Sequence, residues 1–302
     1  MRVLVTGARG FTAAHLLAIL QRDDSVTSIA AWDIEGPSVP KTLYQTVDIT
    51  SLDDVRTAME SFNPEFVFHL AAVPRGDEAT CLRVNLDGTW NVFEAARGLE
   101  FSPRVLVVSS AAVYGLTKPC ETPVVESTPL RPVSPYGVSK AGAEALALSY
   151  HRRGLVPCTV IRPFNLIGPG LPEGFVATDF IARARAVKDA KDGTLPVGNL
   201  DPLRDFIDVR DVVDAYHRVM QNPHTDGSIF NVASGEARSI REILDVILEK
   251  VGAKAEVVVD PDKVRPVEVR EQAGSFTAIH EALGWQPTIG LEQSIEDMLA
   301  QA

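Results

Sequence analysis

The chain has few cysteines and no clusters of residues with the spacing of metal ligands. Its 302 residues include only Cys81, Cys120 and Cys158, which are widely separated. Isolated cysteines are typical of proteins in a reducing compartment and argue against a disulfide framework. We therefore expect a cytoplasmic protein without a metal site.

The sequence also lacks a long hydrophobic segment and an excess of basic residues. No apolar run approaches the roughly 18 residues of a membrane-spanning helix, and because the first residues enter a strand pattern directly, we expect no signal peptide. The formal net charge of -11 argues against nucleic acid or an acidic membrane surface as the main partner. A small anionic ligand stays open, because the local placement of arginines decides that question. Repeats and low-complexity segments are absent as well.

The first residues predict a strand, a glycine turn and a helix. Residues 2–6 have the pattern of a buried strand, and an apolar helical run covers residues 15–20. Gly7, Gly10 and Ala13 lie between them with the spacing Gly-x-x-Gly-x-x-Ala. Gly7 permits a tight turn, Gly10 lets a pyrophosphate approach the backbone at a helix N-terminus, and Ala13 allows close packing. The unit predicts a dinucleotide site.

Acidic residues at two later strand ends bear on the choice of cofactor. A second strand, residues 26–32, leads to Asp33, twenty residues after Ala13. A carboxylate there can accept hydrogen bonds from both adenosine-ribose hydroxyls and repels a 2′-phosphate, which favours NAD over NADP. Arg9 lies inside the glycine turn and could reach a 2′-phosphate, so NADP stays open. Asp48 could accept from the adenine amino group.

Tyr136 and Lys140 form a candidate acid–base pair at the start of a helix over residues 136–152. Four residues separate them, so both side chains project from one face of the helix. An ammonium beside a phenol favours the phenolate and lowers its pKa, so the pair can exchange a proton with a carbonyl or alcohol oxygen. Ser110 follows a strand over residues 104–108, and we expect it to meet Tyr136 at the carboxyl ends of the strands. Alone, a Tyr-x-x-x-Lys pattern is common by chance, and a solvated helix start is the alternative.

From Pro163 onward, Pro and Gly become frequent and helical runs alternate with short strands. We predict an α/β fold, a Rossmann-type doubly wound parallel sheet in residues 1–162 with a smaller C-terminal α/β substrate-binding lid in residues 163–302. Residues 205–235 are expected to return to the sheet. The elements expected in this part are helices at 178–191, 211–221 and 240–251, the last with the capping box Ser239/Glu242, and strands at 206–209, 229–232 and 256–259.

Ten motifs in order resemble the extended short-chain dehydrogenase/reductases that act on nucleotide sugars. They are Thr6-Gly-Ala-Arg-Gly-Phe, Asp33, His69-Leu-Ala-Ala, Asn85 with Gly88-Thr, Ser109-Ser-Ala-Ala-Val-Tyr-Gly, Tyr136-Gly-Val-Ser-Lys, Arg162-Pro-Phe-Asn, Arg204-Asp-Phe-Ile-Asp-Val, Asn231-Val-Ala-Ser-Gly and Leu283-Gly-Trp. The segments beginning at Asn165, Gly198 and Val264 are similar to the branch of GDP-mannose 4,6-dehydratases and GDP-6-deoxy-4-keto-mannose reductases.

The resemblance implies a role for each matched position. Ser110 would bond the sugar C4 oxygen, Tyr136 would be the acid/base, and Lys140 would bind the nicotinamide ribose. The implied substrate-binding residues are Ser110, Ala111, Asn165, Arg204 and Arg265, with the two arginines on the pyrophosphate. The motifs and the resemblance assign the cofactor to Gly7, Arg9, Gly10, Phe11, Asp33, Asp48, Ile49, Leu70, Ala71, Ala72, Asn85, Tyr136, Lys140 and Pro163.

The two residues that follow Ser110 in the sequence help to distinguish the possible reactions. The family's dehydratases carry an acidic residue there to move the C5 proton, whereas this chain has Ala111 and Ala112, which argues against dehydration. No cysteine follows Ser110 directly, as an enzyme that epimerises C3 and C5 would require. An NAD(P)-dependent C4 reductase of a 4-keto-6-deoxy sugar is therefore favoured, and an NAD-dependent C4 epimerase is the alternative. A non-catalytic regulator is disfavoured because the Ser-Tyr-Lys set is complete.

A loop and two helices complete the expectations. The loop at residues 74–81 is shorter than in the family, which leaves the exact substrate open. His69 is expected to be a packed strand-end residue rather than a catalyst. The helices 83–98 and 137–152 carry surplus small and apolar residues and in the family pair into a four-helix bundle, so a homodimer is expected. The residues that suggest it are Ala141, Ala145, Leu148 and Tyr150.

Overall fold

The computed structural model describes residues 1–36, 42–189, 193–263 and 269–301. Within them, seven strands form one parallel sheet in the order β10-β6-β5-β4-β1-β2-β3. The strand order reverses its direction between β1 and β4, and ligands of doubly wound sheets bind beside such a point, at the carboxyl ends of the strands. The strands are β1 (Arg2–Thr6), β2 (Ser28–Asp33), β3 (Leu43–Thr46), β4 (Phe66–His69), β5 (Arg104–Val108), β6 (Cys158–Pro163) and β10 (Ile229–Val232).

Helices cover both faces of this sheet because its strands are apolar on both sides. Val3 and Val5 of β1 belong to one buried cluster and Leu4 belongs to the other, as the alternation of side chains along a strand requires. The first cluster includes α1 (Phe11–Leu20) and α7 (Val209–Gln221), and the second includes α2 (Leu52–Phe62), α4 (Gly88–Arg97) and α5 (Pro135–Arg152).

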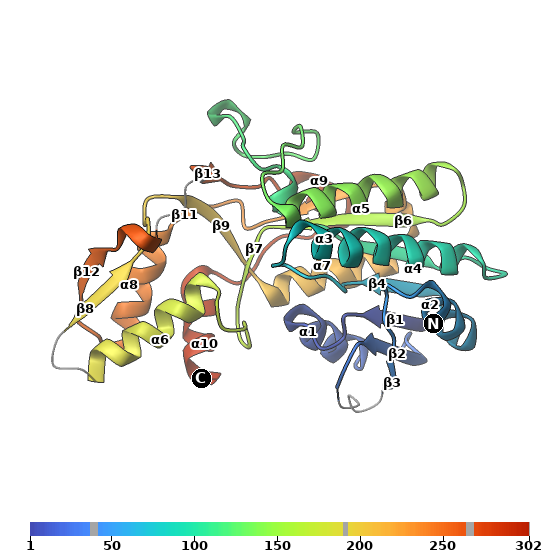
Figure 1. Cartoon of the computed structure of the whole chain (residues 1–302), viewed down its shortest axis with the longest axis horizontal. Helices are drawn as coiled ribbons and strands as arrows, with labels where there is room; N and C mark the ends of the chain where they lie inside the picture. Colours follow the sequence, from blue (N-terminus) through green and yellow to red (C-terminus); the bar gives the residue numbers. More distant parts are fainter. Residues whose placement is uncertain (37–41, 190–192, 264–268, 302) are drawn as a thin grey trace.

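The C-terminal elements surround a third apolar cluster. Figure 1 shows β8, β12, α6 and α8 gathered at the opposite end of the molecule from β1 and β2. A four-stranded sheet lies between these ends and contains β7 (Asn165–Ile167), β9 (Leu203–Asp208), β11 (Ala237–Ser239) and β13 (Glu271–Gln272). The remaining elements are β8 (Thr194–Val197), which pairs with β12 (Glu256–Val259), and the helices α6 (Val176–Asp189), α8 (Ile240–Val251), α9 (Thr277–Leu283) and α10 (Leu291–Gln301).

Several predicted elements are confirmed, and two are corrected. The strand at 229–232, the helix at 240–251 and its capping box between Ser239 and Glu242 form as expected. β9 starts at Leu203 rather than at residue 206, and it pairs within the four-stranded sheet instead of returning to the large one. Of the segment 205–235, β10 pairs into the seven-stranded sheet and α7 packs on it, whereas β9 pairs with β7 and only its Ile207 joins the same apolar cluster.

The second correction concerns the helix expected over residues 83–98. A π-helical turn (Leu82–Asp87) precedes α4 there, and the short helix α3 (Glu78–Cys81) precedes that turn. Two of the residues that suggested a dimer, Leu148 and Tyr150, are buried inside the chain and pack against α4 and the sheet, so they offer no surface to a second copy. None of the helices in the described ranges has the length and apolarity that crossing a membrane requires.

Candidate active site

A cavity of about 990 Å³ lies at the carboxyl ends of the sheet strands. The connections that follow β1, β4, β5 and β6 line one side of it, and C-terminal segments line the other. Eight of the residues expected to bind a cofactor line this cavity: Gly7, Gly10, Phe11, Leu70, Ala72, Tyr136, Lys140 and Pro163. Ser110, Asn165 and Arg204 line it as well. Arg265 lies outside the described residues.

The cavity is strongly cationic although the chain carries a net negative charge. Arg75, Lys140, Arg204 and Lys263 line it, and the described lining residues include no Asp, Glu, His or Cys. Fixed positive groups favour anionic ligands such as diphosphates, and one of the four, Lys263, also pairs with Asp260 at 2.8 Å outside the lining. No group of three or more potential metal-ligating side chains occurs among the residues that the structure describes.

The glycine turn leaves room for a diphosphate at the start of α1. Gly7 has a φ of +67°, and a Cβ atom there would lie 2.7 Å from the Ala71 backbone, so a larger residue does not fit. Gly10 is the N-cap of α1, and the first turn of this helix carries no acidic residue. The amide groups and the positive end of the helix dipole therefore face the cavity, and these residues fit a dinucleotide pyrophosphate.

Asp33 is held in one orientation at the end of β2. Its Oδ2 accepts a hydrogen bond of 2.9 Å from the Arg9 amide, and its Oδ1 accepts one of 2.8 Å from the Ile34 amide. The Arg9 guanidinium lies 3.8 Å from the Glu35 carboxylate, and both side chains are exposed. A second carboxylate therefore lies beside the only guanidinium of the glycine turn.

Tyr136 lies in the first turn of α5, where the Ser134 side chain accepts from the Gly137 amide and caps the helix. Ser110 lies beside the Tyr136 hydroxyl, as expected, so a side-chain hydrogen bond between them acts on the pKa of Tyr136. Burial raises the pKa of Tyr136 to about 12, and the Ser110 bond opposes this shift. The expectation that Lys140 lowers this pKa is corrected. The Lys140 Nζ lies 5.9 Å from the centre of the Tyr136 ring and donates a bond of 2.7 Å to the Val108 carbonyl.

A buried ion pair behind Lys140 was not predicted from the sequence. Burial lowers the pKa of Lys140 to about 8, and the charge of Glu144, one turn further along α5, acts in the opposite direction. Glu144 pairs with Arg162 of β6 at 2.7 Å and also accepts from the Ser109 hydroxyl. Arg162 donates a further bond of 2.8 Å to Tyr114. The signal for this network is a charged residue inside an otherwise apolar strand.

Several predicted binding residues serve the scaffold instead of lining the cavity. Asn85 accepts from the Val73 amide at 2.8 Å and donates to Ser139 at 2.9 Å, so it fixes the connection after β4. Asp48 accepts from Thr50. Ile49, Ala71 and Ala111 pack in the apolar clusters, and Ala112 rather than Ala111 lines the cavity.

His69 is a packed residue, as expected. It is 2% exposed, and its ring nitrogens bond the hydroxyls of Thr6 at 2.9 Å and Thr89 at 3.0 Å. Burial, followed by the charge of Lys140, lowers the pKa of His69 to about 3, so the ring is neutral at ordinary pH.

The C-terminal segments contact the opposite wall of the cavity through an arginine, a contact that the sequence did not reveal. The Arg75 guanidinium donates to the Gly174 carbonyl and lies 4.9 Å from the centre of the Phe175 ring. Asn165 donates to the Asp205 carbonyl at 2.8 Å, and Arg204 donates to the Leu203 carbonyl at 2.8 Å. The connection after β4 therefore contacts the segment before α6 at the cavity.

Comparison with known proteins agrees with this geometry. The family model described as GDP-mannose 4,6 dehydratase matches residues 4–298. The chain belongs to this family. The GDP-6-deoxy-D-mannose reductase of Pseudomonas aeruginosa is 35% identical to it over 99% of this chain and 96% of its own length.

Two solved structures show the same fold as this member of the GDP-mannose 4,6 dehydratase family. RMD from Pseudomonas aeruginosa, complexed with NADPH, has a TM-score of 0.86 and 34% identity, covering 99% of this chain and 98% of that chain. The UDP-glucose 4-epimerase of Thermus thermophilus, complexed with NAD, has a TM-score of 0.87 and 28% identity, covering 100% of this chain and 98% of that chain.

Proposed function

We propose that this protein is an NAD(P)-dependent oxidoreductase that reduces the C4 keto group of a GDP-linked 4-keto-6-deoxy-hexose. The observation that supports this proposal against dehydration is that the described lining of the cavity contains the Ser110-Tyr136-Lys140 set and no carboxylate. Dehydration would require a further group to remove the C5 proton, and the methyl groups of Ala111 and Ala112 cannot transfer one. The similarity to the Pseudomonas reductase supports the same reaction and the GDP group.

Tyr136 is the proton donor in this proposal. When bound, the reduced nicotinamide supplies a hydride to the C4 carbon. Ser110 and Tyr136 hold the C4 oxygen, and Tyr136 gives its proton to the forming alkoxide. The raised pKa of Tyr136 suits this direction, because the phenol keeps its proton until a stronger base forms. Lys140, fixed on Val108, places its positive charge against the Tyr136 ring.

The cofactor pyrophosphate is assigned to Gly7, Gly10 and the start of α1. Asp33 is assigned to the adenosine ribose, and its fixed carboxylate, with Glu35 beside Arg9, supports a preference for NAD. The relative solved with NADPH makes NADP the alternative.

The substrate diphosphate is assigned to the cationic side chains of the lid. Arg204 and Lys263 line the cavity, and Arg265 is assigned from sequence alone. Residues 1–162 would thus bind the cofactor and residues 163–302 the substrate, with α7 and β10 returned to the first unit. Three free cysteines are consistent with a cytoplasmic location.

We also propose a homodimer. Leu82, Trp90 and Val138 are large, apolar and exposed on the π-helical turn, α4 and α5. Ala141 and Ala145 continue the stripe of Val138 along α5 at helical spacing, so two copies could pair these helices closely.

Reduction is tested with purified protein, GDP-4-keto-6-deoxy-mannose made in situ, and NADH or NADPH. We expect loss of cofactor absorbance in proportion to product. Tyr136→Phe should reduce the rate by at least about a hundredfold, because it removes the general acid. Unchanged absorbance, with NAD+ released only after denaturation and C4 inversion of a nucleotide sugar, would identify an epimerase instead.

A further inference from the structure

Tyr216 of α7 has a buried hydroxyl without a hydrogen-bond partner among the described residues. Its side chain is fully buried. Among the residues that the structure describes, its oxygen is the one buried side-chain polar atom without a hydrogen bond. A buried hydroxyl left unpaired destabilises the folded chain relative to a paired one. Phenylalanine would fill the same apolar space without this penalty, so the oxygen needs another explanation.

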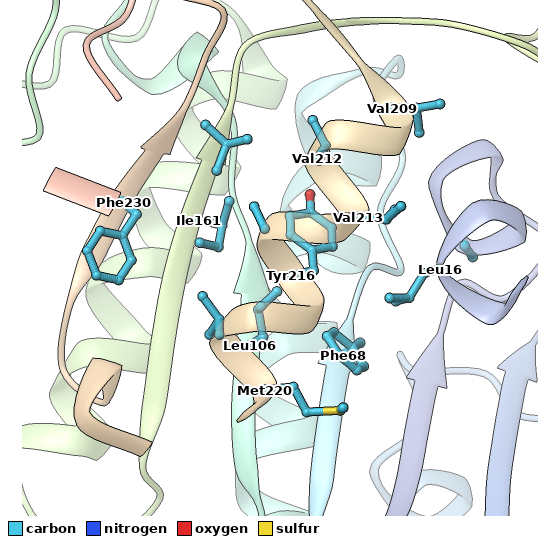
Figure 2. Packing of buried hydrophobic residues seen from close by; sticks show 14 of the residues in the cluster. Leu16, Phe68, Leu106, Ile161, Val209, Val212, Val213, Tyr216, Met220 and Phe230 are labelled. Atoms are coloured by element: carbon cyan, nitrogen blue, oxygen red, sulfur yellow. The ribbon is translucent and has the colours of Figure 1, made fainter. Parts of the chain in front are cut away.

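The unpaired hydroxyl points toward the candidate active site. Figure 2 shows the ring of Tyr216 among Leu106, Ile161 and Phe68, with its oxygen directed to the Val209 end of α7 and along the direction of the strand arrows. The cavity lies at those strand ends, and Tyr216 is part of its wall together with Gly7, Gly10 and Tyr136.

The environment of Tyr216 makes it a neutral donor. Burial, with the nearby Tyr136 acting in the same direction, raises the pKa of Tyr216 far above its usual value. It therefore remains protonated at all working pH values. A phenol in this state can donate one hydrogen bond to an oxygen atom in the cavity. The nicotinamide half of a dinucleotide offers such atoms in its carboxamide and in the pyrophosphate.

We propose that the Tyr216 hydroxyl donates a hydrogen bond to the bound nicotinamide cofactor. Tyr216 would thus complete the cofactor site from α7, on one face of the sheet. This inference depends on the proposed function for the identity of the ligand. The hydroxyl is unpaired and fully covered in the free chain, so the side chains around it must shift as the cofactor binds and brings an acceptor within reach. Tyr216 therefore lowers the stability of the free protein and strengthens cofactor binding.

Tyr114 is a matched control for this inference. It is also a fully buried tyrosine, but its hydroxyl donates to Asn231 at 2.6 Å and accepts from Arg162 at 2.8 Å. It does not line the cavity. Removing the hydroxyl of Tyr114 should therefore have the opposite consequences from removing that of Tyr216.

The experiment compares Tyr216→Phe and Tyr114→Phe with the wild type by thermal unfolding and by titration with NADH and NADPH. For Tyr216→Phe we expect an unfolding temperature, without cofactor, equal to or above that of the wild type. Its Kd for the preferred cofactor should rise about five- to tenfold. For Tyr114→Phe we expect unfolding about 2–4 °C lower and an unchanged Kd.

Two results would overturn the inference while leaving the proposed function intact. The first is an unchanged Kd for Tyr216→Phe. The second is a lower unfolding temperature of this variant without cofactor, which would mean that a buried water already pairs the hydroxyl. A wild-type protein that binds neither cofactor would overturn the proposed function itself.

Discussion

Lys140 carries its charge where water hardly reaches it, at 4% exposure. Burial lowers its pKa from 10.5 to about 8. Between these pH values the unfolded chain binds a proton that the folded chain does not, so stability rises with pH in this window. Below about pH 8 the full unfavourable contribution of the buried ammonium is present.

Replacing Lys140 by Met should remove this pH dependence along with activity. We expect the unfolding temperature of the wild type to rise relative to Lys140→Met as pH increases from about 8 to 10.5. Thermal unfolding of both proteins across this range measures the effect. A difference that stays constant would show that Lys140 keeps an ordinary pKa.

Asp33 and Asp48 offer a paired test of cofactor choice. Asp33→Asn should reduce the preference for NADH over NADPH by about tenfold, because the negative charge that repels a 2′-phosphate is lost. Asp48→Asn should leave the preference unchanged, since Asp48 is exposed and its carboxylate accepts from Thr50. The ratio of the two Kd values reports the preference. If the two substitutions changed the cofactor preference equally, the assignment of Asp33 to the adenosine ribose would be wrong.

At the level of secondary structure, the Arg162–Glu144 pair joins β6 to α5. Both side chains are 3% exposed, so neither charge can be transferred to water when the other is removed. The ion pair holds α5, the helix that carries Tyr136 and Lys140, against β6, the strand that ends at Pro163.

Glu144→Leu should therefore lower the free energy of unfolding by about 3 kcal/mol or more, because it leaves a buried guanidinium without its partner. Urea denaturation measures this loss. Glu121→Leu is the control, since Glu121 pairs with Arg131 at the same 2.7 Å in a more exposed place. Its loss should be much smaller. Similar losses would mean that burial of the first pair does not matter.

At the scale of the whole molecule, the exposed apolar stripe of Leu82, Trp90 and Val138 predicts that two copies of the chain pair as a dimer. Val138→Glu places a charge in the centre of the proposed helix bundle and should convert a dimer into a monomer. Gel filtration should show the mass of two chains for the wild type and of one chain for the variant.

Phe101→Glu is the control for the dimer prediction. Phe101 is 77% exposed after the end of α4, away from the stripe, so its replacement should leave the assembly unchanged. A wild-type protein that elutes as one chain would end the dimer proposal.

The sequence by itself determined the features that depend on near neighbours. The strand, turn and helix around Gly7 and Gly10, the capping box at Ser239 and the spacing of Tyr136 and Lys140 all follow from residues within one turn or one loop. Strand ends in a parallel sheet meet at one edge, so even the approach of Ser110 to Tyr136 could be predicted.

Only the tertiary structure decided which distant side chains share an environment. Arg75 contacts Gly174 across 99 residues, and Tyr114 bonds Asn231 across 117 residues. Burial is likewise a property of the packed chain, and it raised the pKa of Tyr136 where the adjacent Lys140 suggested a decrease. The unpaired hydroxyl of Tyr216 was also visible only in the tertiary structure. The periodic pattern of a helix shows which face is buried, but it does not show whether a hydroxyl on that face has an acceptor.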